Sequence, residues 1–154
     1  FAWLHLRACL SRLHEQDGVN CMDSQHQFTI HTQSVGARLV IMEVRGEIDA
    51  TTHVQLQEMM AESCRRGTCY LLLDLSAVPF MGSAGLRALH AIDEMLRQQA
   101  ATSGVAVLSE DSFKSPCLKL LNPHPAVART LTISGFEMIF DIFTDRQAAI
   151  NSFG

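Results

Sequence analysis

The feature that most constrains the fold is a nearly unbroken apolar run at residues 69–75, which reads CYLLLDL. An apolar run of this length without alternation is typical of a strand that helices cover on both faces. We therefore expect this strand at the middle of a sheet. No apolar run in the chain reaches the length of about 18 to 20 residues that a membrane-spanning helix requires.

The residues before this run predict a hairpin and a helix. Residues 27–31 alternate polar and apolar side chains, and residues 39–44 are apolar and β-branched, so a glycine-containing turn between them predicts two antiparallel strands. Apolar side chains then recur at helical spacing after Thr51 or Thr52, either of which can cap a helix. The amino-terminal part of the fold is therefore strand, strand, helix.

The residues after the run predict further alternation of helices and strands. The predicted elements are a helix over residues 83–99, a strand at 105–108, an extra helical turn within 113–121, a helix from Pro125 that Ser134 and Gly135 close, a strand at 136–140, and a final helix from Thr144 to residue 150. The extra turn is expected because the connection over residues 110–125 is long. The pattern predicts an α/β fold with a mixed sheet, an N-terminal hairpin and about four helices.

The composition limits the number of domains and the kinds of partner, metal and cofactor to expect. A length of 154 residues with 47% hydrophobic residues fits one packed domain. The net charge is −4 and charges of both signs are interspersed, so we expect no direct nucleic-acid partner. The cysteines form no C-x-x-C pair and the histidines no metal-binding spacing, and no cofactor motif is present, so we expect reduced thiols, no metal and no cofactor.

The first part of the chain predicts an extension. Residues 1–21 carry apolar side chains, but charged residues and histidines interrupt them, so they lack the unbroken apolar centre of a signal peptide. Met22 stands just before the first predicted strand. We expect the domain to comprise residues 22–154, with residues 1–21 an extension.

Four segments, in this order, carry a family resemblance: RGEID at residues 45–49, LLDLS at 72–76, FMGSAGL at 80–86 and SGF at 134–136. Together they resemble the STAS domain, the fold of sulfate transporter tails and anti-sigma factor antagonists. The resemblance runs from about Gln27 to the end of the chain. It implies a cytoplasmic regulatory protein without enzyme activity that binds an anti-sigma factor or serine kinase.

The resemblance also implies site residues. In the bacterial antagonists the loop after the third strand carries Asp-Ser-Ser-Gly or Asp-Ser-Thr-Gly, and a partner kinase phosphorylates the first hydroxyl residue. By position that residue here is Ser83. The expected partner-binding residues are Glu47, Asp49, Met81, Gly82, Ser83, Ala84, Gly85 and Leu86. The oligomeric state stays open.

This chain departs from the family pattern at two positions. Gly82 stands where the family usually has aspartate, and Ala84 where it usually has a second hydroxyl residue. Ser83 is therefore the single hydroxyl residue of the motif. The departure at Gly82 keeps an alternative open, in which the protein is a STAS docking subunit of a larger assembly, for example in lipid transport, without phosphorylation.

Physical chemistry favours Ser83 as a modification site independently of the family. A helix N-terminus has unpaired N–H groups and a partial positive charge, so it tolerates a phosphate. The simpler interpretation is that Ser83 only caps the helix, a role worth about 1 kcal/mol. The loop segment at residues 45–49 has the equally simple interpretation of a strand-to-helix turn.

Two enzyme-like or signalling alternatives fit less well. A hydrolase nucleophile elbow requires glycine two residues before the serine, and Met81 is there. A response-regulator receiver could use Asp74 at the end of the buried strand, but it also needs a pair of acids after the first strand, which residues 27–32 do not offer. The sequence therefore predicts a binding protein.

Overall fold

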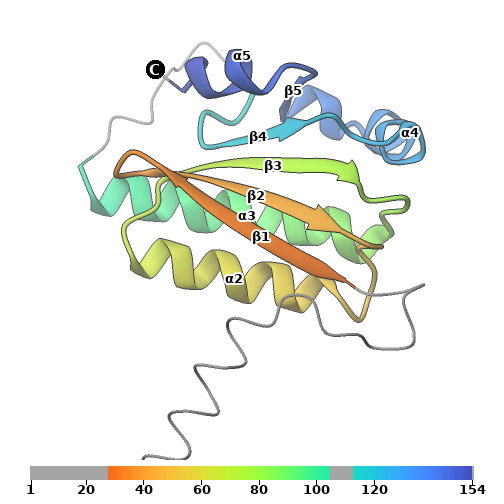
Figure 1. Cartoon of the computed structure of the whole chain (residues 1–154), viewed down its shortest axis with the longest axis horizontal. Coiled ribbons are helices and arrows are strands. Elements are labelled where there is room, and N and C mark those ends of the chain that lie inside the picture. The colour runs from red at the N-terminus through yellow and green to blue at the C-terminus, as the bar shows by residue number, and fades with distance from the viewer. Residues whose placement is uncertain (1–27, 105–112, 154) are drawn as a thin grey trace, which may run out of the picture.

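The computed structural model describes residues 28–104 and 113–153, whose arrangement Figure 1 shows. Five strands form one sheet in the order β1-β2-β3-β4-β5. They are β1 (Thr29–Val35), β2 (Leu39–Arg45), β3 (Tyr70–Ala77), β4 (Leu118–Leu121) and β5 (Asp141–Phe143). The apolar run thus forms the middle strand, as predicted.

The sheet is mixed, which confirms the predicted fold class. β1 and β2 pair antiparallel as a hairpin, and the pairs β2–β3, β3–β4 and β4–β5 are parallel. Helices stand between the parallel strands or follow them: α2 (His53–Arg65), α3 (Ser83–Thr102), α4 (Pro125–Ser134) and α5 (Arg146–Asn151). The carboxyl ends of β2 and β3, which pair in parallel, therefore lie at one edge of the sheet.

Helices cover both faces of the sheet. Figure 1 shows α2 and α3 side by side against one face and α5 on the other. The larger core lies under α2 and α3, where Val44 and Leu73 of the sheet belong to the same buried cluster as Met60 and Leu89 of the helices. The smaller core joins Ile41 and Leu72 to the residues around α5. Since side chains alternate along a strand, neighbouring residues of β2 and β3 enter different cores.

Two predicted helix ends are confirmed. Pro125 is the first residue of α4, and Gly135 follows that helix with φ 78°, a left-handed conformation that glycine adopts easily. Thr52 holds the N-cap position of α2, but its hydroxyl makes no capping bond. It instead donates to the Glu47 carbonyl and accepts from the Asp49 N–H.

The prediction for the end of the chain is wrong in detail. Residues 136–140 are not a strand, because Phe136–Met138 form a 3₁₀ helix, η1, and the last strand is β5. The Phe136 carbonyl accepts hydrogen bonds from the N–H groups of Ile139 and Phe140, which closes a helical turn. The cap of the last helix is Asp145, not Thr144, and its carboxylate accepts from the N–H of Ala148.

The helical turn predicted within residues 113–121 is also wrong, because β4 occupies Leu118–Leu121 and pairs with β3. Leu118 and Leu120 enter the larger core, while Lys119 and Leu121 face the α5 side. The strand predicted at residues 105–108 and the boundary at residue 22 lie outside the described residues.

Candidate functional site

Two loops at the carboxyl ends of neighbouring strands are joined by their backbones. The β2–α2 loop comprises residues 46–52 and the β3–α3 loop residues 78–82. Ile48 N–H donates to the Phe80 carbonyl at 3.0 Å, and Gly82 N–H donates to the Ile48 carbonyl at 3.0 Å. Ile48 and Met81 also form a parallel β-bridge. The structure therefore brings the two predicted site segments together.

Ser83 is the first residue of α3, and its side chain is exposed. Gly82 holds the N-cap position with φ −84° and ψ −178°, an extended backbone that any residue can adopt. No side chain caps α3, and its first turn has no acidic residue. The positive end of a helix of 20 residues thus meets solvent at Ser83 without a neighbouring carboxylate in that turn.

Two of the predicted site residues are buried. The Met81 side chain is 1% exposed and packs with Ile48, which is fully buried. A Cβ atom at Gly85 would lie 2.5 Å from Met81 Cγ and 2.9 Å from Ile48 Cγ2. Gly85 therefore permits α3 to approach the joined loops, and neither Met81 nor Gly85 offers a side chain to a partner.

Asp49 orders the β2–α2 loop just before α2 begins at His53. Its Oδ1 accepts hydrogen bonds from the N–H and hydroxyl of Thr51 and from the N–H and hydroxyl of Thr52, over 2.7 to 3.3 Å. The bond from the Thr51 hydroxyl is the largest of the causes that lower the pKa of the Asp49 carboxyl to about 2. The Asp49 side chain therefore stabilises the conformation of the β2–α2 loop.

The other predicted residues lie at the surface of this edge. Glu47 and Ser83 are exposed, and Gly82, Ala84 and Leu86 are half-buried. Sequence reasoning missed Phe80, whose side chain is 50% exposed and whose Cε1 lies 3.5 Å from the position of a Cβ at Gly82. Phe80 is apolar, as are Val78 and Met81, which are buried, so the sequence carries no signal that its ring is exposed.

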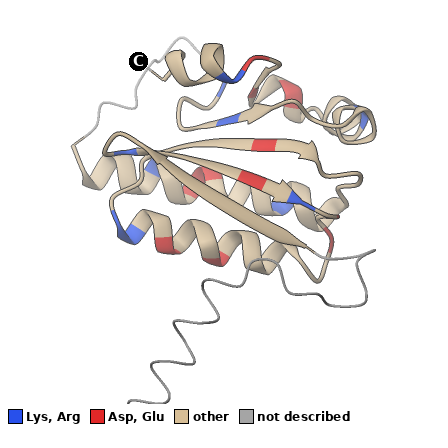
Figure 2. Ribbon diagram, viewed as in Figure 1, with Lys and Arg blue, Asp and Glu red and all other residues tan. Residues whose placement is uncertain are grey.

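The charged residues of the described part of the chain do not gather on one side of the fold. Figure 2 shows acidic and basic residues distributed over helices and strands. Cys64, Cys69 and Cys117 are free thiols, and burial raises the pKa of Cys117 to about 11 and raises that of Cys64. Within residues 28–104 and 113–153, no group of three His, Cys, Asp or Glu side chains could hold a metal ion.

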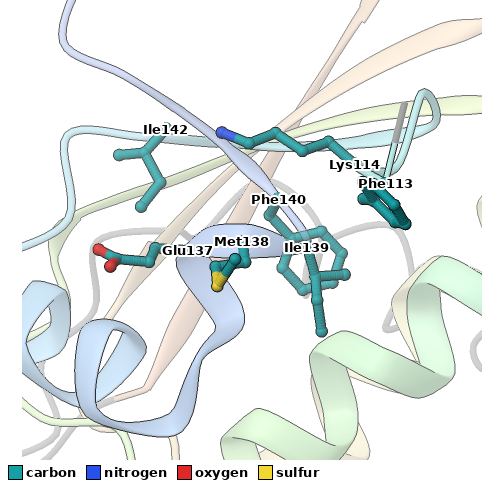
Figure 3. A pocket seen from close by; sticks show the side chains of 7 residues that line it. All are labelled: Phe113, Lys114, Glu137, Met138, Ile139, Phe140 and Ile142. Atoms are coloured by element: carbon teal, nitrogen blue, oxygen red, sulfur yellow. The ribbon is translucent and has the colours of Figure 1, made fainter. Parts of the chain in front are cut away.

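An apolar groove lies elsewhere, beside η1 and β5. Figure 3 shows the side chains that line it: Phe113, Lys114, Glu137, Met138, Ile139, Phe140 and Ile142. Lys114 and Asp141 form an ion pair of 3.2 Å at this end of the sheet. None of the predicted site residues belongs to the groove. None of the described helices is both long and apolar enough to cross a bilayer.

The chain has relatives among known proteins. Residues 29–114 match the STAS domain. BtrV of Bordetella bronchiseptica, whose name assigns it to the anti-sigma factor antagonists, is 30% identical over 115 residues, which are 75% of this chain and 86% of BtrV. The anti-sigma-F factor antagonist RsfB of Mycobacterium tuberculosis is 37% identical over 68 residues, which are 44% of this chain and 56% of RsfB.

Solved structures share the fold. The anti-sigma factor antagonist SpoIIAA in its unphosphorylated form has a TM-score of 0.63 at 18% identity, over 80% of this chain and 94% of SpoIIAA. The phosphorylated form of SpoIIAA, from Bacillus, has a TM-score of 0.57 at 18% identity, over 80% and 97%. An anti-sigma factor antagonist from Mycobacterium paratuberculosis has a TM-score of 0.62 at 21% identity, over 88% and 98%.

Proposed function

We propose that this chain, which belongs to the STAS domain family, acts as an anti-sigma factor antagonist whose binding to an anti-sigma factor is switched by phosphorylation of Ser83. The observation that carries the proposal is the position of Ser83, exposed as the first residue of α3 beside the joined loops. The names of BtrV, RsfB and SpoIIAA support the class of function.

The surface around Ser83 has the composition of a small protein interface. Phe80 offers an exposed aromatic ring, Leu86 a half-buried aliphatic side chain, and Glu47 a charge at the margin. Aromatic anchors with a polar rim are typical of binding surfaces. The partner would contact this edge through exposed side chains, while Met81 and Gly85 keep the loops in place.

The modification itself is a phosphoryl transfer that a kinase performs. The Ser83 Oγ forms a bond to the terminal phosphorus of a nucleoside triphosphate, the bond to the bridging oxygen breaks, and the nucleoside diphosphate leaves. The hydroxyl proton passes to a base on the kinase or to water. The product adds a charge of about −1.5 to −2 at a helix N-terminus, where the fold tolerates it.

Phosphorylation would act on binding because the phosphate is strongly hydrated. A partner that packs on Phe80 and Ser83 would have to remove water from this group, at a cost that disfavours the complex. The family's usual aspartate is absent at Gly82, so the charge change at Ser83 is the main electrostatic change in this turn.

Binding and mass spectrometry test the proposal. The protein is incubated with candidate anti-sigma factor kinases and ATP, and one phosphate on Ser83 is expected. Ser83→Asp should weaken binding of the anti-sigma factor by about tenfold or more, which corresponds to about 1.4 kcal/mol. Ser83→Ala should bind like the unmodified protein and be insensitive to the kinase.

Ser103→Asp is a matched control, because Ser103 lies at the opposite end of α3 and is exposed. It should leave binding unchanged. Equal binding by Ser83→Asp and Ser83→Ala would rule out the switch. A stable complex with a partner that never requires modification of Ser83 would favour the docking-subunit alternative, which the glycine at position 82 keeps open.

A further inference from the structure

Arg87 follows Ser83 by four residues in α3, a spacing that places the two residues on the same face of the helix. We infer that Arg87 is the internal counter-ion for a phosphate on Ser83, an inference that rests on the proposed function of that serine. The guanidinium would hold the phosphate against the first turns of α3 and favour its doubly charged form. Arg87 would thus be a positioning residue for the modified state.

The helix geometry brings the two groups together. Residues four apart in a helix are neighbours, with Cβ atoms about 5 to 6 Å apart. Ser83 and Arg87 are both exposed and both within α3. The Cα–Cβ bond of a helical residue tilts toward the helix N-terminus, so the long Arg87 side chain leans toward Ser83. An anion four residues before a cation is also the favourable order along a helix.

The charges in the described residues leave Arg87 available for this role. None of the hydrogen bonds or ion pairs found among residues 28–104 and 113–153 involves its guanidinium, whereas Arg97 of the same helix is paired with Asp93 at 3.0 Å. A guanidinium matches phosphate oxygens with two parallel N–H groups. The first turn of α3 has no acidic residue that could compete for it.

Arg45 is the other arginine at this edge of the sheet, but it belongs to the opposite face. Its neighbour Val44 is buried in the core under α2 and α3. Because side chains alternate along a strand, the Arg45 side chain leaves β2 on the face away from α3. The pairing with Ser83 therefore falls to Arg87.

A titration of the phosphate tests the inference. Phosphoserine is incorporated at position 83 during translation, so that no kinase and no partner is needed, and the second ionisation of the phosphate is followed by ³¹P NMR. We expect the midpoint to lie lower by about 0.3 pH unit, about twofold in the ionisation constant, than in the same protein with Arg87→Gln. High salt should reduce the difference.

Two further variants make the result specific. Arg87→Lys keeps the charge and should keep most of the lowered midpoint. Arg38→Gln removes an exposed arginine that immediately precedes β2, at the end of that strand away from the loops, and should titrate like the parent. Identical midpoints in the parent and Arg87→Gln would overturn the inference. Failure of a kinase to modify Ser83 would overturn the proposed function and leave this titration unaffected.

Discussion

The residue at the N-cap of α3 is Gly82, which has no side chain. Its extended backbone suits any residue, and a Cβ there would meet Phe80 Cε1 at 3.5 Å, an ordinary contact. The N–H groups of the first turn of α3 receive no side-chain cap. An oxygen acceptor at position 82 would therefore find both space and partners.

We predict that Gly82→Asp stabilises the protein. The carboxylate would cap α3 and interact with its positive end, and we expect the free energy of unfolding to rise by about 0.5 to 1 kcal/mol at neutral pH. Urea unfolding measures this change. Gly82→Ala fills the same space without an acceptor and should be neutral or slightly destabilising. Equal stabilities for the two variants would show that the end of α3 does not need a cap.

Some residues of the site could be predicted from sequence and others could not. The helix start at Ser83 can be predicted, because Gly82 precedes it and apolar residues at helical spacing follow it. The burial of Met81 and Gly85 could not be predicted, because it depends on how closely the loop around Ile48 approaches α3. That approach is a tertiary contact between segments more than 30 residues apart in the sequence.

Among the helices and strands, α3 is linked to the start of β4 by a buried polar cluster. The Asp93 side chain is nearly buried and accepts hydrogen bonds from the Ser115 hydroxyl and from Arg97. The Ser115 oxygen in turn accepts from the N–H groups of Cys117 and Leu118, each at 3.2 Å. The cluster fixes the chain where it enters the sheet for its fourth strand.

We predict that Ser115→Ala destabilises this connection. The change removes a partner of a buried carboxylate and an acceptor for two backbone N–H groups, so we expect a loss of about 1 to 3 kcal/mol in the free energy of unfolding. Denaturant unfolding of the variant measures it. Ser76→Ala, at an exposed serine, should change stability by less than about 0.5 kcal/mol. A loss no larger than that control would mean that the cluster does not stabilise the fold.

The elements that sequence reasoning placed correctly are those with strong local signals. The hairpin, α2, α3 and α4 each combine periodicity with a turn or cap residue, and β3 is a nearly unbroken apolar run. β4 was missed because its central Lys119 interrupts an apolar run. The buried Lys119 ammonium donates hydrogen bonds to Ser152, and it lies 4.0 Å from the Asp141 carboxylate and 4.8 Å from the centre of the Phe153 ring. These partners come from the end of the chain, which local pattern cannot reveal.

At the scale of the whole molecule, the carboxylate of Asp49 in the β2–α2 loop makes the stability of the fold depend on pH in acid. The pKa of Asp49 is lowered to about 2 from an ordinary 3.8, so its ionised form is favoured in the folded state. The stabilisation that the ionised Asp49 carboxylate gives the folded protein is therefore complete above about pH 3.8, and it is lost as the pH falls toward 2.

We predict that Asp49→Asn is less stable than the parent at neutral pH. The difference in the free energy of unfolding should shrink as the pH falls from about 3.8 toward 2. Unfolding by urea at a series of pH values measures it. Thr51→Val removes the hydroxyl that contributes most to the lowered pKa of Asp49. It should therefore raise this pKa and narrow the pH range over which the stabilisation is lost. A difference that stays constant down to pH 2 would contradict the assignment.

The two loops of the site are held to each other by main-chain atoms, with Ile48 N–H and carbonyl both engaged. Amino-acid replacement does not remove such bonds, unless proline is introduced. The outward side chains beside them can therefore diverge while the framework persists. Duplicated copies of such a protein can therefore bind different partners in one cell, because a few exposed side chains beside the loops suffice to distinguish them.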